Sequence, residues 1–408
     1  MNLKSIDNMH IGWIDFSEKD RRTALDVMLI GMQQGTVDEL GTGIISEAFS
    51  NYFFPGTSTI QTRAKYFFLV PYAMQETIRQ KTVKRPEDAL RVLDNTEEQT
   101  AVLLSSNCKN ETGIIGQDNI QHNKWVKRSP SSIYWTGLRT LGFFNTPMGL
   151  NPSISEYLRM EIAQRGNLKS NVDDNLCDDI DRDDIDAGHS MYNEYWNLPY
   201  NFNWREKLKI ELSSDEATFF AEKIKTNKKG TLLDFLLKEE CGTDASSFAD
   251  MAKALMYKIP NKLRSMMQLA LNFDGLFYLG TILFNLELSE DQNEQALKEW
   301  EFYRPKASTM AERVDLKLIF NSLHIHNDKE YTFLKDLLAC FIDNTDESIK
   351  KARCLIACRS KALKGGNSKL CRKKEFDNQT WSGGGHQDYR YRNAKIILED
   401  IKRGLKDA

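Results

Sequence analysis

The stretch "KLRSMMQLALNFDGLFYLGTILFNL", residues 262–286, is apolar on almost every side when it is wound as a helix. A helix with this pattern is buried on most sides, so it belongs in the core of a helical domain. Asn272, Asp274, Asn285 and the following Glu287 interrupt the stretch. A membrane span of about 20 apolar residues would not accept these side chains easily. We therefore expect a central core helix here and no membrane segment.

Helix start signals recur before this stretch. Three capping boxes stand at Ser58–Gln61, Ser153–Glu156 and Ser213–Glu216. In each box the serine hydroxyl can cap a backbone N–H while the Glu or Gln side chain reaches back. Gly166 is expected to end the helix that the second box starts. Because no long alternating pattern is present, we predict a mainly α fold of two helical domains, with short irregular or minor β segments.

The domain boundaries follow from size and from one acidic run. A chain of 408 residues is too long for a single hydrophobic core. Residues 173–186 contain eight aspartates and one arginine, a composition that repels itself and cannot form a core. We predict an N-terminal helical domain at 1–169, an acidic loop or linker at 170–190, and a C-terminal helical domain with a basic tail at 191–408.

The overall composition indicates the compartment. The net charge of −3 is too small to mark the whole molecule as a nucleic-acid-binding protein, so any such surface requires local segregation of charge. Seven cysteines, an odd number, follow no regular framework, which favours a reducing compartment. The first twenty residues contain no continuous apolar core of the kind that a signal peptide needs. The sequence predicts a cytoplasmic protein without a membrane contact.

A second stretch, "FFPGTSTIQTRAKYFFLVP" at residues 53–71, carries candidate chemistry. If Ser58 caps a helix, the free N–H groups of the first turn and Arg63 can bind an anion such as a phosphate. Alternatively the hydroxyls only cap the helix, and Arg63 pairs with an acidic residue such as Asp15, Asp38 or Glu47. A third possibility is a buried polar network that fixes the N-terminal domain. The candidate binding residues are Thr57, Thr59, Gln61 and Arg63.

Residues 116–142 interleave basic and aromatic side chains, a pattern that can grip a nucleic-acid backbone while stacking bases. Tyr134 lies on the apolar side of a predicted helix and is expected to face the core. The exposed pair Lys127 and Arg128 are the candidate binding residues of this cluster.

The C-terminal segment is strongly basic. Residues 359–403 hold twelve Lys and Arg against five Asp and Glu, an excess of seven positive charges. A polyanion can bind such a segment, and so can the acidic run of the same chain. The candidate binding residues here are Arg372, Lys373, Arg390 and Arg392.

Metal and catalytic motifs give little support for an enzyme. Cys354 and Cys358 stand one helical turn apart, but the second ligand pair of a zinc site is missing, so we predict no metal and no cofactor. An acidic cluster of Asp15, Asp38 and Glu39 near Arg63 is the one arrangement that would suit a metal-dependent nuclease.

The segments "IGWIDFSEKDRRTALDV", "TVDELGTGIISEAF" and "FFPGTSTIQTRAKYFFLVPY" resemble, in this order, an uncharacterised bacterial family. It is a domain of unknown function found in phage-defence operons, with FPGTSTIQTRA as its signature. We call these eleven residues, 54–64, the signature segment. The resemblance implies that members are encoded near superfamily-two helicases and phospholipase-D-type nucleases, and it supplies no catalytic residues. It also favours a real site or a buried network at the signature segment over a simple helix start.

Together these observations predict a non-catalytic, nucleic-acid-associated adaptor subunit of a multi-protein bacterial anti-phage system. DNA is the expected nucleic acid, and a helicase and a phospholipase-D-type nuclease encoded nearby are the expected partners. The alternatives are a structural interaction subunit of such a helicase and nuclease complex, or a metal-dependent nuclease with an unrecognised site.

Overall fold

The structure is a computed structural model that describes residues 38–120, 122, 124–145, 151–173, 195–198, 200–206, 208–239 and 244–406. The fold is mainly helical, which confirms the predicted class. Within the described residues, the β pairing outside helices is one isolated antiparallel bridge between Phe144 and Trp196. Most of the predicted acidic linker, together with Asp15, lies outside the described residues.

The chain forms two compact units. Unit 1 comprises residues 1–43, 272–320 and 326–386, and unit 2 comprises residues 44–271, 321–325 and 387–408. The predicted boundaries at 170 and 190 do not coincide with this division, since residues on both sides of them belong to unit 2. The prediction used composition, which cannot show that the last residues of the chain return to pack on the N-terminal half.

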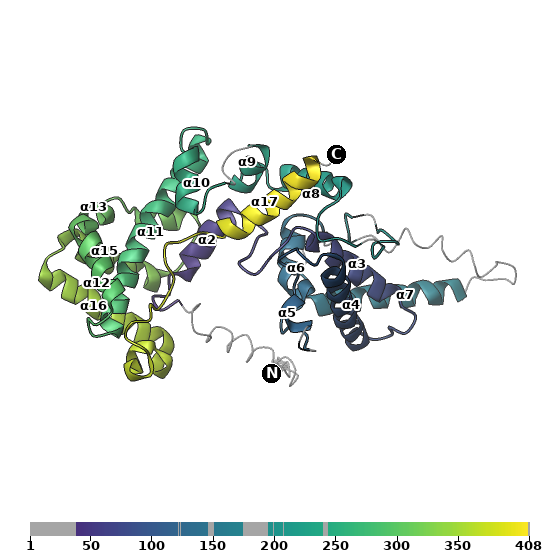
Figure 1. Cartoon of the computed structure of the whole chain (residues 1–408), viewed down its shortest axis with the longest axis horizontal. Helices are drawn as coiled ribbons and strands as arrows, with labels where there is room; N and C mark the ends of the chain where they lie inside the picture. The colour runs from purple at the N-terminus through teal and green to yellow at the C-terminus, as the bar shows by residue number, and fades with distance from the viewer. Residues whose placement is uncertain are drawn as a thin grey trace, which may run out of the picture. The chain divides into compact units, whose positions relative to one another are not determined.

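Unit 2 is built around the signature segment and contains most of the helices in Figure 1. Its helices are α2 (Gly43–Phe53), α3 (Tyr66–Arg79), α4 (Pro86–Asn107), α5 (Gln117–Ile120), α6 (Pro130–Thr140), α7 (Ile154–Asp173), α8 (Ser214–Asn227), α9 (Leu232–Lys238), α10 (Phe248–Leu255) and α17 (Tyr391–Lys406). The long helix α11 (Asn261–Leu288) is shared with unit 1.

The core of unit 2 is aromatic. Phe67 and Phe68 of α3 meet Phe143 with ring centroids 5.5 Å apart in both cases, and Phe67 lies 4.8 Å from Phe220 of α8. The C-terminal helix α17 packs along α8 (Figure 1). This contact is close at Gly404, where an added Cβ would lie 2.7 Å from the Cβ of Ala217, so a larger residue would force the helices apart.

Unit 1 consists of the second part of α11 and the helices that follow it. These are α12 (Glu294–Tyr303), α13 (Ala307–Glu312), α14 (Leu316–Ser322, whose last two residues belong to unit 2), α15 (Asp328–Asp343) and α16 (Asp346–Lys364), with the short 3-10 turns η3 (Arg304–Lys306), η4 (Gly365–Asn367), η5 (Lys369–Cys371) and η6 (Lys373–Glu375). Arg359 of α16 pairs with the fully buried Glu330 of α15. Burial raises the pKa of Glu330 to about 7 even though Arg359 acts to lower it.

Two of the predicted capping boxes are present in the structure. The full capping box of Ser213 and Glu216 is present at the start of α8, and that of Ser153 with Glu156 is present before α7. The predicted stop at Gly166 is wrong, because α7 continues to Asp173. Glycine lowers helix propensity by only about 1 kcal/mol, which neighbouring good helix formers can outweigh.

The apolar stretch at residues 262–286 lies within one continuous helix, α11. Among the described residues, it is the one helix long and apolar enough to cross a membrane, and 83% of its most apolar window is buried inside the protein. A core helix shows the same combination of length, composition and burial.

Candidate functional site

The signature segment does not form the predicted helix. Residues 54–63 connect α2 to α3 through turns, and α3 begins only at Tyr66. At the proposed capping box, Ser58 N donates to Gln61 Oε1 at 3.1 Å, but Gln61 N bonds back to Ser58 O at 3.4 Å and closes a turn. The predicted helix start at Ser58 is therefore wrong, and anion binding by this segment stays a prediction. The preceding Pro55-Gly56 step, with Gly56 at a φ of 86°, already commits this stretch to turns.

Tyr134 of α6 holds the backbone of the signature segment. Its hydroxyl accepts from the N–H groups of Thr62 and Arg63 at 2.9 and 3.1 Å and donates to Arg63 O at 2.9 Å. Burial raises the pKa of Tyr134 to about 12, so the hydroxyl keeps its proton for this bond. Close approach is possible because residue 137 is glycine: an added Cβ would lie 2.6 Å from Gly56 O.

Arg63 is buried, with 5% of its surface exposed, and has two carboxylate partners in unit 2. Its Nε lies 3.0 and 3.1 Å from the two oxygens of Asp400, and its Nη1 donates to Glu111 at 2.9 Å and to Thr112 O at 3.0 Å. Burial alone would lower the pKa of Arg63, but hydrogen bonds and charges from Asp400 and Glu111 raise it above the ordinary value. The guanidinium is thus a fixed, paired cation.

The region around α17 binds the same segment from its other side. Arg390, which directly precedes α17, donates to Thr57 O at 2.8 Å and to Asn51 Oδ1 at 2.7 Å. Asn393 donates to Thr59 O at 3.2 Å and to Gln61 O at 2.8 Å. Asp400 also accepts from the N–H of Ala64 at 2.9 Å. A backbone stretch without its own helix or sheet bonds is satisfied by these partners.

Sequence reasoning missed Tyr134, Asn393 and Asp400 as partners of the signature segment. One signal was present for Asp400. It follows Ile397 and Leu398 and precedes Ile401, so it lies on the apolar side of α17. An acidic residue in such a position requires a buried partner.

The polar candidate residues of the signature segment mostly serve the protein itself. Thr57 is buried and its Oγ1 donates to Phe54 O at 2.7 Å, while Gln61 Nε2 donates to Gly56 O at 3.2 Å. Thr59 is exposed. This geometry corresponds to the buried-network alternative, and binding of a ligand by these residues stays a prediction.

Lys127 and Arg128 lie in the connection between α5 and α6. Lys127 is exposed and Arg128 is half-buried, and neither has a carboxylate partner within ion-pair distance among the described residues. Two aromatic residues of this cluster face inward. Tyr134 is buried as predicted, and Trp135 packs in the core against Phe144 with ring centroids 4.8 Å apart. The two cations are therefore present at the surface without those two aromatic partners.

The four basic candidates near the C-terminus are divided between the two units. Arg372 and Lys373 belong to unit 1, whereas Arg390 and Arg392 belong to unit 2. Each is close to a carboxylate. The shortest distances are 3.3 Å from Arg372 to Glu375, 3.1 Å from Lys373 to Glu287, 3.5 Å from Arg390 to Glu47 and 3.8 Å from Arg392 to Asp388. The excess of positive charge counted along the sequence is thus reduced locally.

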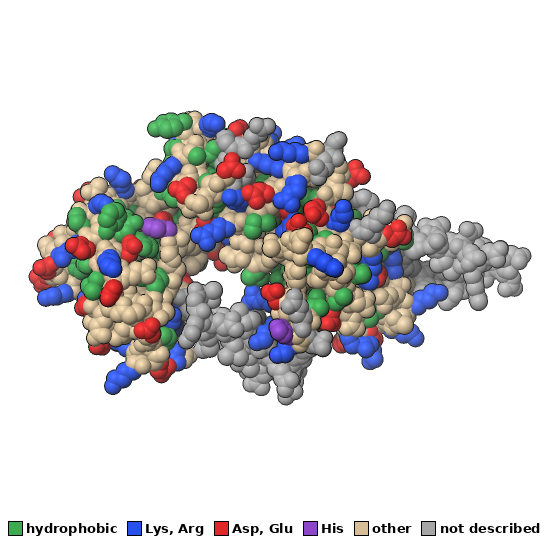
Figure 2. Space-filling view, viewed as in Figure 1, with side chains coloured by type: hydrophobic (Ala, Val, Ile, Leu, Met, Phe, Trp, Pro, Cys, Tyr) green, Lys and Arg blue, Asp and Glu red, His purple; other side chains and the backbone are tan. Residues whose placement is uncertain are grey.

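Positive charge does gather on α17. Figure 2 shows Lys and Arg side chains over this helix. The helix carries five cations, and of its two acidic residues Asp400 turns inward to Arg63. Arg403 and Lys406 are exposed and have no ion-pair partner among the described residues. The second acidic residue, Glu399, lies 3.8 Å from Lys395, so positive charge remains in excess on this side of α17. We call the five cations of the helix, of which Lys395 and Lys402 are half-buried, the α17 basic face: Arg392, Lys395, Lys402, Arg403 and Lys406.

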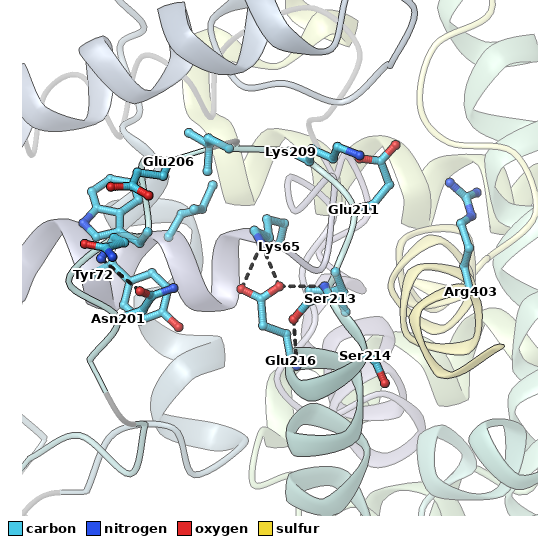
Figure 3. A pocket seen from close by; sticks show the side chains of 15 residues that line it. Lys65, Tyr72, Asn201, Glu206, Lys209, Glu211, Ser213, Ser214, Glu216 and Arg403 are labelled. Carbon is cyan, nitrogen blue, oxygen red and sulfur yellow. Dashed lines mark hydrogen bonds and ion pairs between the residues drawn. The ribbon is translucent and has the colours of Figure 1, made fainter. Parts of the chain in front are cut away.

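A cavity of about 570 Å³ adjoins this face in unit 2 (Figure 3). At its centre Lys65 bonds both oxygens of Glu216, at 2.6 and 2.8 Å. Its remaining charged lining residues are the cations Lys209 and Arg403 and two glutamates, 206 and 211. Because cations and carboxylates balance inside the cavity, the lining favours neither an anion nor a cation.

Three of the residues proposed for a nuclease site, Asp38, Glu39 and Arg63, each have other partners, and the fourth, Asp15, lies outside the described residues. Asp38 accepts from the N–H groups of Gly41 and Leu40 at 2.8 and 3.2 Å in unit 1, while Arg63 is committed in unit 2. Glu39 pairs with Lys364 at 2.9 Å. Across the described part of the chain, there is no group of three or more His, Cys, Asp or Glu side chains that could hold a metal ion.

Residues 8–170 match the model of a family of unknown function, DUF6361. Neither the curated proteins nor the solved structures contain a match to this chain. The matched region includes the signature segment and Tyr134 and ends within α7, so Asp400 and the rest of α17 lie outside it.

Proposed function

We propose that this protein is a non-catalytic adaptor that associates with nucleic acid, most readily DNA, within a multi-protein bacterial anti-phage system. The observation that carries the nucleic-acid part is the α17 basic face, where Arg403 and Lys406 project from a helix whose Asp400 is turned inward. Exposed cations along one helix contact successive phosphates and release counterions from the nucleic acid.

The attachment of α17 to the rest of unit 2 supports the proposal that its exposed side binds nucleic acid. Its apolar side packs on α8, and Asp400 and Asn393 fix it to the signature segment. Cations on a rigid helix lose less side-chain and backbone entropy on binding than cations on a free tail. Lys127 offers a further exposed cation of the same unit.

The adaptor part of the proposal rests on the family resemblance. A neighbouring helicase and a phospholipase-D-type nuclease would supply the catalysis, and this chain would hold nucleic acid or connect those proteins. The same basic face also suits an acidic protein partner, which makes this the main rival outcome.

A filter-binding titration with duplex DNA at two salt concentrations tests the nucleic-acid part. Each phosphate contact contributes roughly 0.9 to the slope of log affinity against log salt. The double variant Arg403→Gln, Lys406→Gln should therefore bind more weakly and lower the slope by about 2. Lys298→Gln is the matched control, since Lys298 is an exposed helical cation of unit 1.

Two results would remove the nucleic-acid part. One is no binding by the wild-type chain at low salt, and the other is an equal slope for the double variant and the control. Co-purification of the neighbouring proteins that survives nuclease digestion and is lost in the double variant would favour the acidic-protein partner instead.

A further inference from the structure

His386 sits in a cluster of polar and aromatic side chains in unit 1. Its Nδ1 lies 2.7 Å from Asp274 Oδ2, and its Nε2 lies 3.3 Å from the Tyr303 hydroxyl. The imidazole ring stacks on Tyr278 with centroids 4.0 Å apart and planes inclined by 23°. Since 48% of the side chain is exposed, the ring can exchange protons with solvent.

Two helices supply the groups that face this imidazole. Asp274 and Tyr278 stand one turn apart on α11, and Glu299 and Tyr303 stand one turn apart on α12. The hydrogen bond from Asp274 raises the pKa of His386 above its ordinary value; burial opposes this, and the charges of Asp274 and Glu299 add to it. Burial raises the pKa of Tyr278 and of Tyr303, so both phenols stay neutral.

The last side chain before the glycines that precede His386 is held to α11. Ser382 exchanges two hydrogen bonds with Asn285 of α11, at 2.8 and 2.7 Å. Between Ser382 and His386 lie three glycines, and an added Cβ at Gly384 or Gly385 would meet nothing within 4 Å. The glycines give this short connection backbone freedom, which the contacts of His386 restrict.

His386 lies at the boundary between the two units in the sequence. His386 is the last residue of unit 1, and Gln387 begins the final segment of unit 2, which leads into α17. Contacts of the imidazole thus fix the point at which the chain leaves unit 1.

We propose that His386 is a protonation-dependent latch that holds the Gly383–Gly385 connection against α11 and α12. In the imidazolium form both ring nitrogens donate, one to Asp274 and the other to Tyr303, and the positive ring stacks on Tyr278. Loss of one proton removes a donor and the attraction to Asp274 and Glu299. The neutral ring is held less tightly, and the glycine connection gains freedom.

The direction of the pH effect follows from linkage. The latched state binds the proton more tightly than the open state, so its stabilisation is fully present below the ordinary histidine pKa of about 6.5. That stabilisation is lost as the pH rises through the higher pKa of the latched imidazole. The connection is therefore closed at acidic pH and opens towards alkaline pH.

Hydrogen exchange of the full-length chain, read on the peptide that covers residues 383–388, tests the latch. After correction for intrinsic exchange, protection should fall between about pH 6 and about pH 8.5, by at most about tenfold for each unit by which the latched pKa is raised. His386→Gln should give low protection at both pH values. His326→Gln, at an exposed histidine of the same unit, should behave as wild type.

An NMR titration of the His386 ring gives a second readout that does not depend on loop motion. Asp274→Asn should lower its pKa by roughly 1 unit or more, because an adjacent carboxylate shifts a partner by this amount. The latch is overturned by protection that is independent of pH in wild type, by equal protection in wild type and His386→Gln, or by an unchanged pKa in Asp274→Asn. None of these measurements uses nucleic acid, so they are independent of the proposed function.

Discussion

The cluster around Arg63 in unit 2 and the cluster around His386 in unit 1 are built from the same parts. Each pairs a basic side chain with an aspartate on a helix and also contains a tyrosine hydroxyl, which bonds the backbone of Arg63 in the first cluster and the ring of His386 in the second. They differ in exposure: Arg63 has 5% of its surface exposed, whereas 48% of the His386 side chain is exposed. Burial makes the first cluster a permanent part of the fold, and partial exposure lets the second respond to pH.

The largest expected effect is at Asp400. Asp400→Ala leaves Arg63 buried without its main partner, so the free energy of unfolding should fall by about 3–5 kcal/mol. Urea unfolding followed by circular dichroism measures this loss. Glu399→Gln changes the neighbouring, half-buried carboxylate and should cost less than about 1 kcal/mol, as should His386→Gln in the other cluster. Equal losses in all three variants would show that the two clusters do not differ in their contribution to stability.

The tyrosine hydroxyls of the two clusters should also differ in their contribution to stability. Tyr134→Phe leaves two buried N–H groups and one carbonyl without the hydroxyl, and we expect a loss of about 1–3 kcal/mol in thermal or urea unfolding. Tyr303→Phe removes a hydroxyl from the half-exposed cluster, where water can replace it, so its cost should stay below about 1 kcal/mol. A reversed order of the two costs would contradict the assignment of the Arg63 cluster as structural.

The smallest expected effects on stability come from alanine substitutions at two glycines, Gly137 and Gly384. Gly137→Ala places a methyl group 2.6 Å from Gly56 O and should destabilise unit 2 by roughly 1–3 kcal/mol through overpacking. Gly384→Ala meets open space and should change the free energy of unfolding by only a few tenths of a kcal/mol. A tolerated Gly137→Ala would show that the signature segment can move away from α6 at little cost.

The parts of the fold that the sequence predicts are those set by near neighbours. The capping box at Ser213 depends on a residue three positions away, and the burial of α11 depends on its own composition. The helix predicted at Ser58 is absent because Tyr134 and α17, which are distant in the sequence, supply hydrogen bonds that stabilise a non-helical backbone there.

The candidate site could be predicted only in part. Arg63 stands out as a charged residue among aromatic residues, but its partner Asp400 is 337 positions away. Any of many carboxylates fits the same charge requirement, and the spacing of residues along the chain does not select one. The basic character of the C-terminal segment was visible, yet its division between two units required the fold.

A double-mutant cycle between Arg63 and Asp400 tests most directly whether the signature segment is a structural network fixed by the C-terminal helix. Unfolding free energies are measured for wild type, Arg63→Met, Asp400→Ala and the double variant. We predict that the double variant loses less than the sum of the single losses, with a coupling energy of about 2 kcal/mol or more. Additive losses, within about 0.5 kcal/mol, would contradict this and leave Arg63 available as a ligand-binding residue.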